Sequence, residues 1–225
     1  MILSHKRKLE ALKNTGYQPT LVVDIGAFIG EWTKTCQTVF PEAKYYLVEP
    51  NMHEVLEPLK SNSNVRVLRE LLFEQDQLVP WFSINFTGDS IFQETTKYYA
   101  HTNPTVRKAI RMETLMIRYQ LSFENERVFV KLDTQGSETH ILRGFSKETL
   151  EKIDFILMEL PFFGRYNYHS PTFLESIQFM DSIGFIPYDL FEEHFMLRFN
   201  TQIDMLFIRK THPFVEEVRQ DIANW

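Results

Sequence analysis

The chain has 225 residues, a formal net charge of −6 and an apolar fraction of 44%. A domain of this length buries roughly 70% of its unfolded surface, enough for one sizeable core. No internal repeat, low-complexity tract or linker-like stretch stands out, so we expect a single domain over residues 1–225. The negative charge argues against nucleic acid as a partner, because there is no basic excess to displace counterions. No apolar stretch approaches a membrane span, and the single cysteine, Cys36, excludes an internal disulfide. We therefore expect a cytoplasmic protein that does not bind a membrane.

The first third of the chain alternates predicted helices with short apolar strands. An amphipathic helix is expected to fill the N-terminal segment 1–16, because Asn14 and Gly16 are good helix stops. The remaining elements follow from apolar runs separated by turn residues. Helices are expected at residues 2–14, 29–39 and 52–59, and strands at 20–24, 44–48 and 65–68.

The alternation stops between residues 78 and 105. Residues 78–85 alternate enough to predict an extra strand, which the turn at 87–90 ends. The segment 86–105 is irregular and aromatic. Long irregular segments in compact domains are often functional, so 86–105 is the candidate lid or substrate loop, with 161–172 as a second recognition loop.

The alternation then resumes and ends in a hairpin. Parallel units closed by a hairpin describe an α/β fold. We predict a doubly wound, mostly parallel seven-stranded sheet with an antiparallel edge hairpin, and ligands bind such sheets beyond the carboxyl ends of the strands. The elements expected here are strands 128–132, 154–159, 185–191 and 203–209, and helices 137–142, 147–152 and 171–183.

A glycine turn follows the first strand. The apolar run 22–30 ends in Gly26 and Gly30, which is typical of a ligand-binding turn. Asp24 would stand in its mouth and repel a pyrophosphate, which binds bare N–H groups at the positive end of a helix. S-adenosylmethionine has no phosphate and carries a sulfonium and an ammonium. The acidic turn therefore favours S-adenosylmethionine and methyl transfer.

A second carboxylate, Glu49, ends the second strand. It could accept both ribose hydroxyls of an adenosine, in NAD and S-adenosylmethionine alike. The dinucleotide fingerprint G-x-G-x-x-G is not matched, because Asp24 stands where its first glycine would be. This disfavours an NAD-dependent oxidoreductase, which remains an alternative. The predicted cofactor-binding residues are Asp24, Gly26, Ala27, Phe28, Gly30, Trp32, Glu49, Pro50, Asp89 and Ser90.

Charged residues also surround the end of the strand at 128–132. Lys131 and Asp133 have the same parity, so they can share one face of the strand and pair. Asp133 would emerge at the carboxyl end, facing the methyl end of the cofactor. Glu138 enters the first turn of the next helix, where the helix dipole favours a carboxylate.

The glycine turn, the end of the second strand around Glu49 and the segment from Lys131 to Glu138 resemble the FkbM-type family of S-adenosylmethionine-dependent methyltransferases. The resemblance implies a class I methyltransferase (Rossmann-like) fold and O-methylation, often of sugars, polyketides or other natural products. Two positions depart from the family pattern: Gln135 stands where glutamate is common, and Phe28 where asparagine is frequent. The matching segments lie at 23–30, 48–51, 131–138, 142–144 and 156–160, within a resemblance over about residues 20–210.

Transfer to an alcohol needs a base near the oxygen or a metal ion that lowers its pKa. Asp133 is the first candidate for this role, and Glu159, expected at the end of the fifth parallel strand, is the second. Together they could hold a Mg²⁺ through hard oxygen ligands, in an arrangement resembling that of catechol-type methyltransferases. His194, expected in the loop between the last two strands, is the third catalytic candidate.

Other interpretations stay open at this point. His140, predicted within a helix, and His169, in a polar aromatic loop, are further base candidates. We expect a small-molecule or glycan acceptor with a hydroxyl group; methylation at nitrogen and a non-catalytic binding module are the alternatives. The chain has 20 phenylalanines and nine tyrosines, so some aromatic side chains could lie on the surface. A homodimer would cover such a surface.

Overall fold

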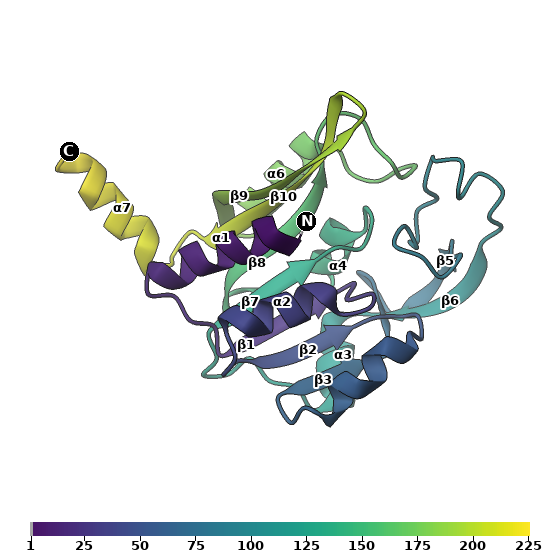
Figure 1. Cartoon of the computed structure of the whole chain (residues 1–225), viewed down its shortest axis with the longest axis horizontal. Helices are drawn as coiled ribbons and strands as arrows, with labels where there is room; N and C mark the ends of the chain where they lie inside the picture. Colours follow the sequence, from purple (N-terminus) through teal and green to yellow (C-terminus); the bar gives the residue numbers. More distant parts are fainter. Residues whose placement is uncertain (1) are drawn as a thin grey trace.

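The computed structural model describes residues 2–225 and places a seven-stranded sheet at its centre (Figure 1). The strands are β1 (Leu21–Ile25), β2 (Lys44–Val48), β3 (Val65–Leu68), β7 (Val128–Leu132), β8 (Ile153–Pro161), β9 (Phe185–Met196) and β10 (Phe199–Arg209). Their order across the sheet is β3-β2-β1-β7-β8-β10-β9. The first five strands in that order are parallel, and β10 and β9 are antiparallel. The predicted doubly wound sheet with an antiparallel edge hairpin is confirmed.

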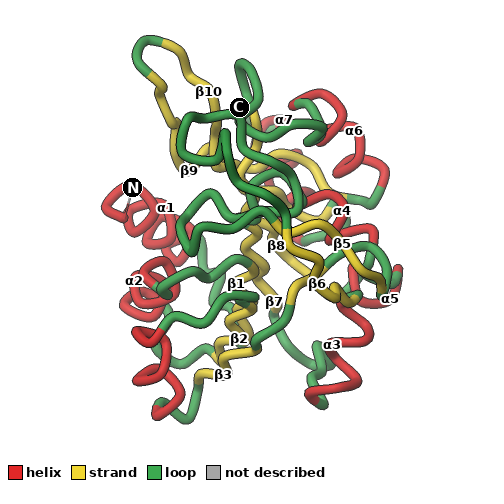
Figure 2. The backbone as a smooth tube through the Cα atoms, turned by 90° about the vertical axis from the view of Figure 1, so that its right-hand side faces the viewer, coloured by secondary structure: helices red, strands yellow, loops and turns green. Residues whose placement is uncertain are grey.

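Helices cover both faces of this sheet (Figure 2). One face carries α1 (Ile2–Asn14) and α2 (Glu31–Val39), and the other carries α3 (Met112–Tyr119), α4 (Glu138–Arg143), α5 (Lys147–Leu150) and α6 (Phe173–Ser182). A last helix, α7 (Pro213–Ala223), leads away from the body of the molecule in Figure 1. Within residues 2–225, no helix has both the length and the apolar character needed to cross a membrane.

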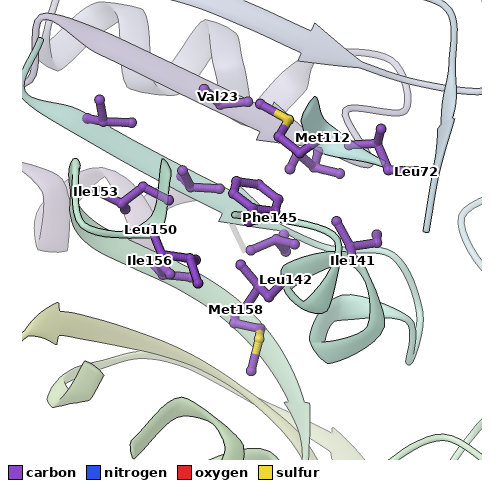
Figure 3. Packing of buried hydrophobic residues seen from close by; sticks show 14 of the residues in the cluster. Val23, Leu72, Met112, Ile141, Leu142, Phe145, Leu150, Ile153, Ile156 and Met158 are labelled. Carbon is purple, nitrogen blue, oxygen red and sulfur yellow. The ribbon is translucent and has the colours of Figure 1, made fainter. Parts of the chain in front are cut away.

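The core consists of two layers because neighbouring strand residues point to opposite faces. Every residue of β1 and β7 is buried. On the face covered by α3 to α6, Val23 and Ile156 pack with Leu142 and Phe145 (Figure 3). On the opposite face, Phe129 packs among residues of α1 and α2. This double burial explains why the parallel strands read as continuous apolar runs.

A second, three-stranded sheet lies beside the main one, where β5 and β6 are labelled in Figure 1. It consists of β4 (Leu71–Leu72), β5 (Gln77–Trp81) and β6 (Thr105–Ile110), in the order β4-β6-β5. The strand predicted at 78–85 corresponds to β5 but ends earlier. Its last part turns back instead, because the backbone of Phe82 pairs with Ser90.

Several sequence predictions are wrong in detail. The helix expected at 52–59 is a 3₁₀ helix, η1 (Glu54–Ser61), with Pro58 inside it, where a proline cannot donate an α-helical hydrogen bond. The closing hairpin is longer than expected, and β9 and β10 show register shifts near Asn200 and Asp204. His194 therefore lies on β9 rather than in a loop. The sequence interpretation missed β4, β6, α3 and α7.

Candidate functional site

A cavity of about 380 Å³ opens at the carboxyl ends of β1, β2, β7 and β8, the edge where doubly wound sheets bind ligands. Its volume is in the range of small-molecule sites. Ten of the residues predicted for the cofactor or for catalysis line it. They are Gly26, Ala27, Phe28, Trp32, Glu49, Pro50, Asp89, Asp133 and Glu159, and His194 joins them from β9.

The glycine turn brings the end of β1 close to the loop after β7. Gly26 has a φ of 78°, and a Cβ there would collide with the carbonyl oxygen of Asp133, so only glycine fits. Its N–H donates to the carbonyl of Val48 at 2.9 Å. Phe28 also has a left-handed backbone, with a φ of 47°, and its ring packs edge-on against His53. The turn is thus held against both neighbouring strands.

Asp24 does not stand in the mouth of the turn as the sequence suggested. Its side chain is fully buried and accepts a hydrogen bond from Oγ1 of Thr33 at 2.6 Å. The Nζ of Lys131 lies 3.4 Å from its other oxygen. Asp24 is a strand residue, followed by one more residue of β1, so it lies below the cavity and joins α2 to β7.

Glu49 is built into the cavity wall by main-chain hydrogen bonds. Its carboxylate oxygens accept the N–H groups of Phe28 at 2.9 Å and of Asn51 at 2.8 Å. Burial outweighs these bonds and raises the pKa of Glu49 to about 7. A carboxylate offers about four acceptor positions, so the two main-chain bonds leave positions for ligand hydroxyls.

The remaining predicted cofactor residues have different surroundings. Asp89 lines the cavity and accepts hydrogen bonds from Asn51 at 2.7 Å and from the Tyr99 hydroxyl at 2.8 Å. Ser90 is buried and does not line the cavity; its hydroxyl donates to the Gln135 carbonyl at 2.9 Å. Gly30 also lies outside the cavity wall. Ser90 and Gly30 therefore lie behind the residues that form the cavity wall.

The two loops expected to recognise the acceptor contact each other. The backbone of Glu94 pairs with that of Asn167, and the N–H of Tyr168 donates to the Gln93 carbonyl at 2.8 Å. From the segment 86–105, Phe86, Thr87 and Asp89 reach the cavity wall. The two loops therefore contact each other, but only the segment 86–105 contributes residues to the cavity wall.

A polar chain crosses the cavity floor between β7 and β8. Lys131 lies 3.2 Å from Asp133, which confirms the pair predicted from strand parity. The side-chain amide of Gln135 donates to Asp133 at 3.0 Å and to Glu159 at 2.8 Å. Burial raises the pKa of Glu159, and the charge of Asp133 adds to the effect.

This arrangement does not fit the predicted Mg²⁺ site. An amide nitrogen, which carries only donors, occupies the position between Asp133 and Glu159 where a shared cation would stand. In the part of the chain that the structure describes, Asp133 belongs to no group of three metal-ligating side chains. No catalytic step is assigned to a metal ion.

His194 belongs to a hydrogen-bonded network that the sequence did not reveal. Its Nε2 lies 3.2 Å from Oδ2 of Asp204 on β10, which raises the pKa of His194. The same oxygen lies 2.9 Å from Nε2 of His5 on α1. The indole N–H of Trp32 donates to Nδ1 of His5 at 3.0 Å. No local motif marks Asp204 or His5, since tertiary folding alone brings them together.

The other two histidine candidates lie away from the cavity. His140 on α4 contacts Glu74 at 3.2 Å and stacks on Phe73, in agreement with a structural role. His169 is exposed and has a left-handed backbone, with a φ of 64°. Neither residue lines the cavity.

The charge of the cavity wall is strongly unbalanced. Lys131 is its only lysine or arginine among the described residues. The carboxylates that line it are Glu31, Glu49, Glu70, Asp89, Asp133 and Glu159. Such a wall attracts a cationic ligand and opposes a phosphate.

The sequence matches the family model of the methyltransferase FkbM domain over residues 24–187. A comparison with curated proteins gave no match. Among solved structures, the chain is similar to the 1,6-didemethyltoxoflavin-N1-methyltransferase of Burkholderia thailandensis, with 13% identity, 92% of this chain and 79% of that chain covered, and a TM-score of 0.48.

A second similar structure is the precorrin-6y C5,15-methyltransferase of Geobacter metallireducens, with 12% identity, coverage of 93% and 88%, and a TM-score of 0.48. A third is the magnesium protoporphyrin IX methyltransferase of Synechocystis, with 10% identity, coverage of 92% and 84%, and a TM-score of 0.48. At these scores the likenesses carry no argument about acceptor or mechanism. The family match spans most of the chain, and the chain therefore belongs to the FkbM family of S-adenosylmethionine-dependent methyltransferases.

Proposed function

We propose that this methyltransferase transfers the methyl group of S-adenosylmethionine to a hydroxyl of a sugar, a glycan or a related natural product. The observation that carries the cofactor assignment is the acidic cavity wall, which holds Glu49 at one strand end and Asp133 at another. The cofactor, when bound, supplies an electrophilic methyl group on a sulfonium centre.

The order of strands gives each residue its place along the cavity. Glu49 follows β2, and Glu159 lies on β8, three strands away in the sheet. At about 4.8 Å between neighbouring strands, this separation is about 14 Å. Glu49 would bind the ribose hydroxyls, Asp133 would face the transferred methyl group, and the acceptor would approach along β8 and β9.

An acceptor hydroxyl is a weak nucleophile at neutral pH, so its proton must leave as the new carbon–oxygen bond forms. Three side chains at the acceptor end can take that proton: Asp133, Glu159 and His194. The residues around the cavity also have to hold the hydroxyl oxygen in line with the carbon–sulfur bond that breaks, which is a positioning task.

Fewer observations support the class of acceptor than support the identity of the cofactor. A sugar hydroxyl suits a rim that combines aromatic and polar side chains, such as Phe86, Thr87 and Gln202. The family resemblance, with its association with sugars and natural products, supports the same class. A nicotinamide cofactor is disfavoured, because its pyrophosphate would face the acidic wall.

Calorimetry with S-adenosylhomocysteine tests the cofactor assignment. We expect the wild-type chain to bind it and Glu49→Gln to bind it at least tenfold more weakly, since the amide cannot accept both main-chain hydrogen bonds and the ribose hydroxyls. The matched control is Glu42→Gln, a substitution at an exposed residue outside the cavity. Absence of binding by the wild type, or binding of NADH instead, would refute the proposal.

Incubation with methyl-labelled cofactor and a panel of nucleotide sugars and oligosaccharides tests the acceptor. We expect label in a product of the panel, at a carbon–oxygen bond. Label that appears only on amines would move the assignment to nitrogen, and binding of the cofactor without transfer to any member would exclude the sugar class tested.

A further inference from the structure

We propose that Trp32, His5 and Asp204 form a positioning relay that holds His194 with its proton on Nε2 and presents its Nδ1 to the cavity as the proton-accepting atom. This inference rests on the proposed function, since it assigns the base for the same transfer. It adds His5 of α1 and Asp204 of β10 to the site and gives Trp32 of α2, which already lines the cavity, a further role.

The direction of the first two hydrogen bonds in the relay is fixed because the indole of Trp32 can only donate. The indole N–H of Trp32 donates to Nδ1 of His5 at 3.0 Å, so Nδ1 of His5 must accept and its proton must be on Nε2. That Nε2 lies 2.9 Å from Oδ2 of Asp204 and 3.1 Å from Oε2 of Glu192. His5 therefore donates away from Trp32 and towards the hairpin.

The next step depends on the ionisation of Asp204. Burial would raise the pKa of this carboxyl, but hydrogen bonds from His194 and His5 outweigh it and hold the pKa well below its usual range. An ionised carboxylate can only accept. Because Nε2 of His194 lies 3.2 Å from Oδ2 of Asp204, that nitrogen must carry the proton of the neutral ring.

The neutral ring of His194 then has its lone pair on Nδ1. Among residues 2–225, the hydrogen bonds of the His194 ring run from Nε2 to Asp204, and His194 lines the cavity beside Glu159. An imidazole oriented by a carboxylate in this way is a suitable base for a hydroxyl. The ring of Trp32 also lies under Nζ of Lys131, which fixes the first member of the relay.

Charged groups approach His194 from every neighbouring element. Asp204 lies on β10, Glu159 on β8, His5 on α1 and Glu192 on its own strand. Asp133 and Lys131 lie at the end of β7. The carboxylates dominate, and the Asp204 hydrogen bond is the largest contribution to the raised pKa of His194.

Nitrogen-15 NMR of histidine-labelled protein, in which the two ring nitrogens have distinct shifts, tests the relay without an acceptor. In the wild type we expect the neutral forms of both His5 and His194 to carry the proton on Nε2. We expect Asp204→Asn to lower the pKa of His194, because the charge that favours its protonated form is lost. Asp221→Asn, the same change at an exposed position of α7, should leave this titration unchanged.

The far end of the relay is tested by Trp32→Phe, which keeps an aromatic ring and removes the N–H. We expect His5 to keep its proton on Nε2, which faces Asp204, but the resonance of its Nδ1 to shift because the hydrogen bond from the indole is lost. Trp225→Phe, at an exposed position, should change nothing. If these variants do not fold, the wild-type spectrum still decides. A neutral His194 protonated on Nδ1 would overturn the relay.

Activity gives a second readout with any acceptor that takes up label in the transfer assay. The acid limb of the pH profile of kcat should move to lower pH in Asp204→Asn, with kcat reduced by tenfold or more and KM for the cofactor little changed. A chain that transfers methyl groups but shows an unshifted limb refutes the relay alone. A chain that shows the relay by NMR and no transfer refutes only the proposed function.

Discussion

Gln135 holds Asp133 and Glu159 together through one amide nitrogen, at a position where the FkbM-type pattern commonly has glutamate. A carboxylate there would put three acidic groups in one place. Such a cluster repels itself unless protons or a divalent cation neutralise it. The amide of Gln135 instead places a hydrogen-bond donor between the two carboxylates.

We predict that Gln135→Glu creates a dependence on divalent metal. The variant should melt at a lower temperature than the wild type in chelator and regain stability with Mg²⁺ or Mn²⁺. The wild type and the exposed control Gln77→Glu should melt at the same temperature with and without metal. Thermal denaturation measures all three. A wild type that loses activity in chelator would contradict the amide-bridged geometry.

At the residue scale, the sequence predicted contacts between near neighbours and missed distant ones. The pairing of Lys131 with Asp133 followed from strand parity and is confirmed. The contact of His5 with Asp204 joins residues 199 positions apart, and nothing local marks either of them. The prediction placed Asp24 in the cavity because it ended the first strand at residue 24, whereas β1 continues to Ile25.

The first helix is attached to the sheet by both apolar and charged contacts. Leu9 and Leu12 are buried against the face that carries α2, and Lys8 lies 2.8 Å from Asp189 on β9. Since His5 occupies the same helix, the packing of α1 also fixes one member of the relay.

We predict that Leu9→Ala destabilises the chain by about 2–5 kcal/mol, because it leaves a cavity beneath a helix that carries a site residue. The matched control, Leu3→Ala, removes the same atoms from a side chain that is 76% exposed and should change stability by less than about 0.5 kcal/mol. Urea denaturation measures both. Equal losses in the two variants would show that α1 is not packed as described.

Short strands bounded by turn residues were predicted best. The bounds of β2, β3 and β7 agree with the expectation residue for residue, because these strands are apolar and bounded by turn residues. The small sheet was missed since β4 has only two residues, and half-exposed β6 has no continuous apolar run. Tertiary pairing, rather than local propensity, makes these segments strands.

At the scale of the whole molecule, several buried carboxyl groups have pKa values above their ordinary range. Burial raises the pKa of Glu49 and of Glu138 to about 7, and that of Glu159 also lies above its ordinary value. Between about pH 4.5 and 7 the folded chain thus holds more protons than the unfolded chain, so stability falls as pH rises. His194, with a raised pKa, acts in the same direction.

We predict a lower melting temperature at pH 8 than at pH 5.5. His53 and His212, whose pKa values burial lowers, oppose this trend but are fewer than the groups that produce it. Glu138→Gln should flatten the dependence, because the amide oxygen can keep the bonds to Thr134 and Gly136 without the charge. A melting temperature that rises steadily across this range would contradict the assignment.

The placement of His5 on the opening helix has a practical consequence for anyone producing this enzyme. A purification tag fused ahead of that helix sits only a few residues from a histidine that helps arrange the reactive centre. The opposite terminus follows α7, whose residues are mostly exposed and which leads away from the sheet (Figure 1). Attaching the tag there keeps foreign sequence far from the chemistry.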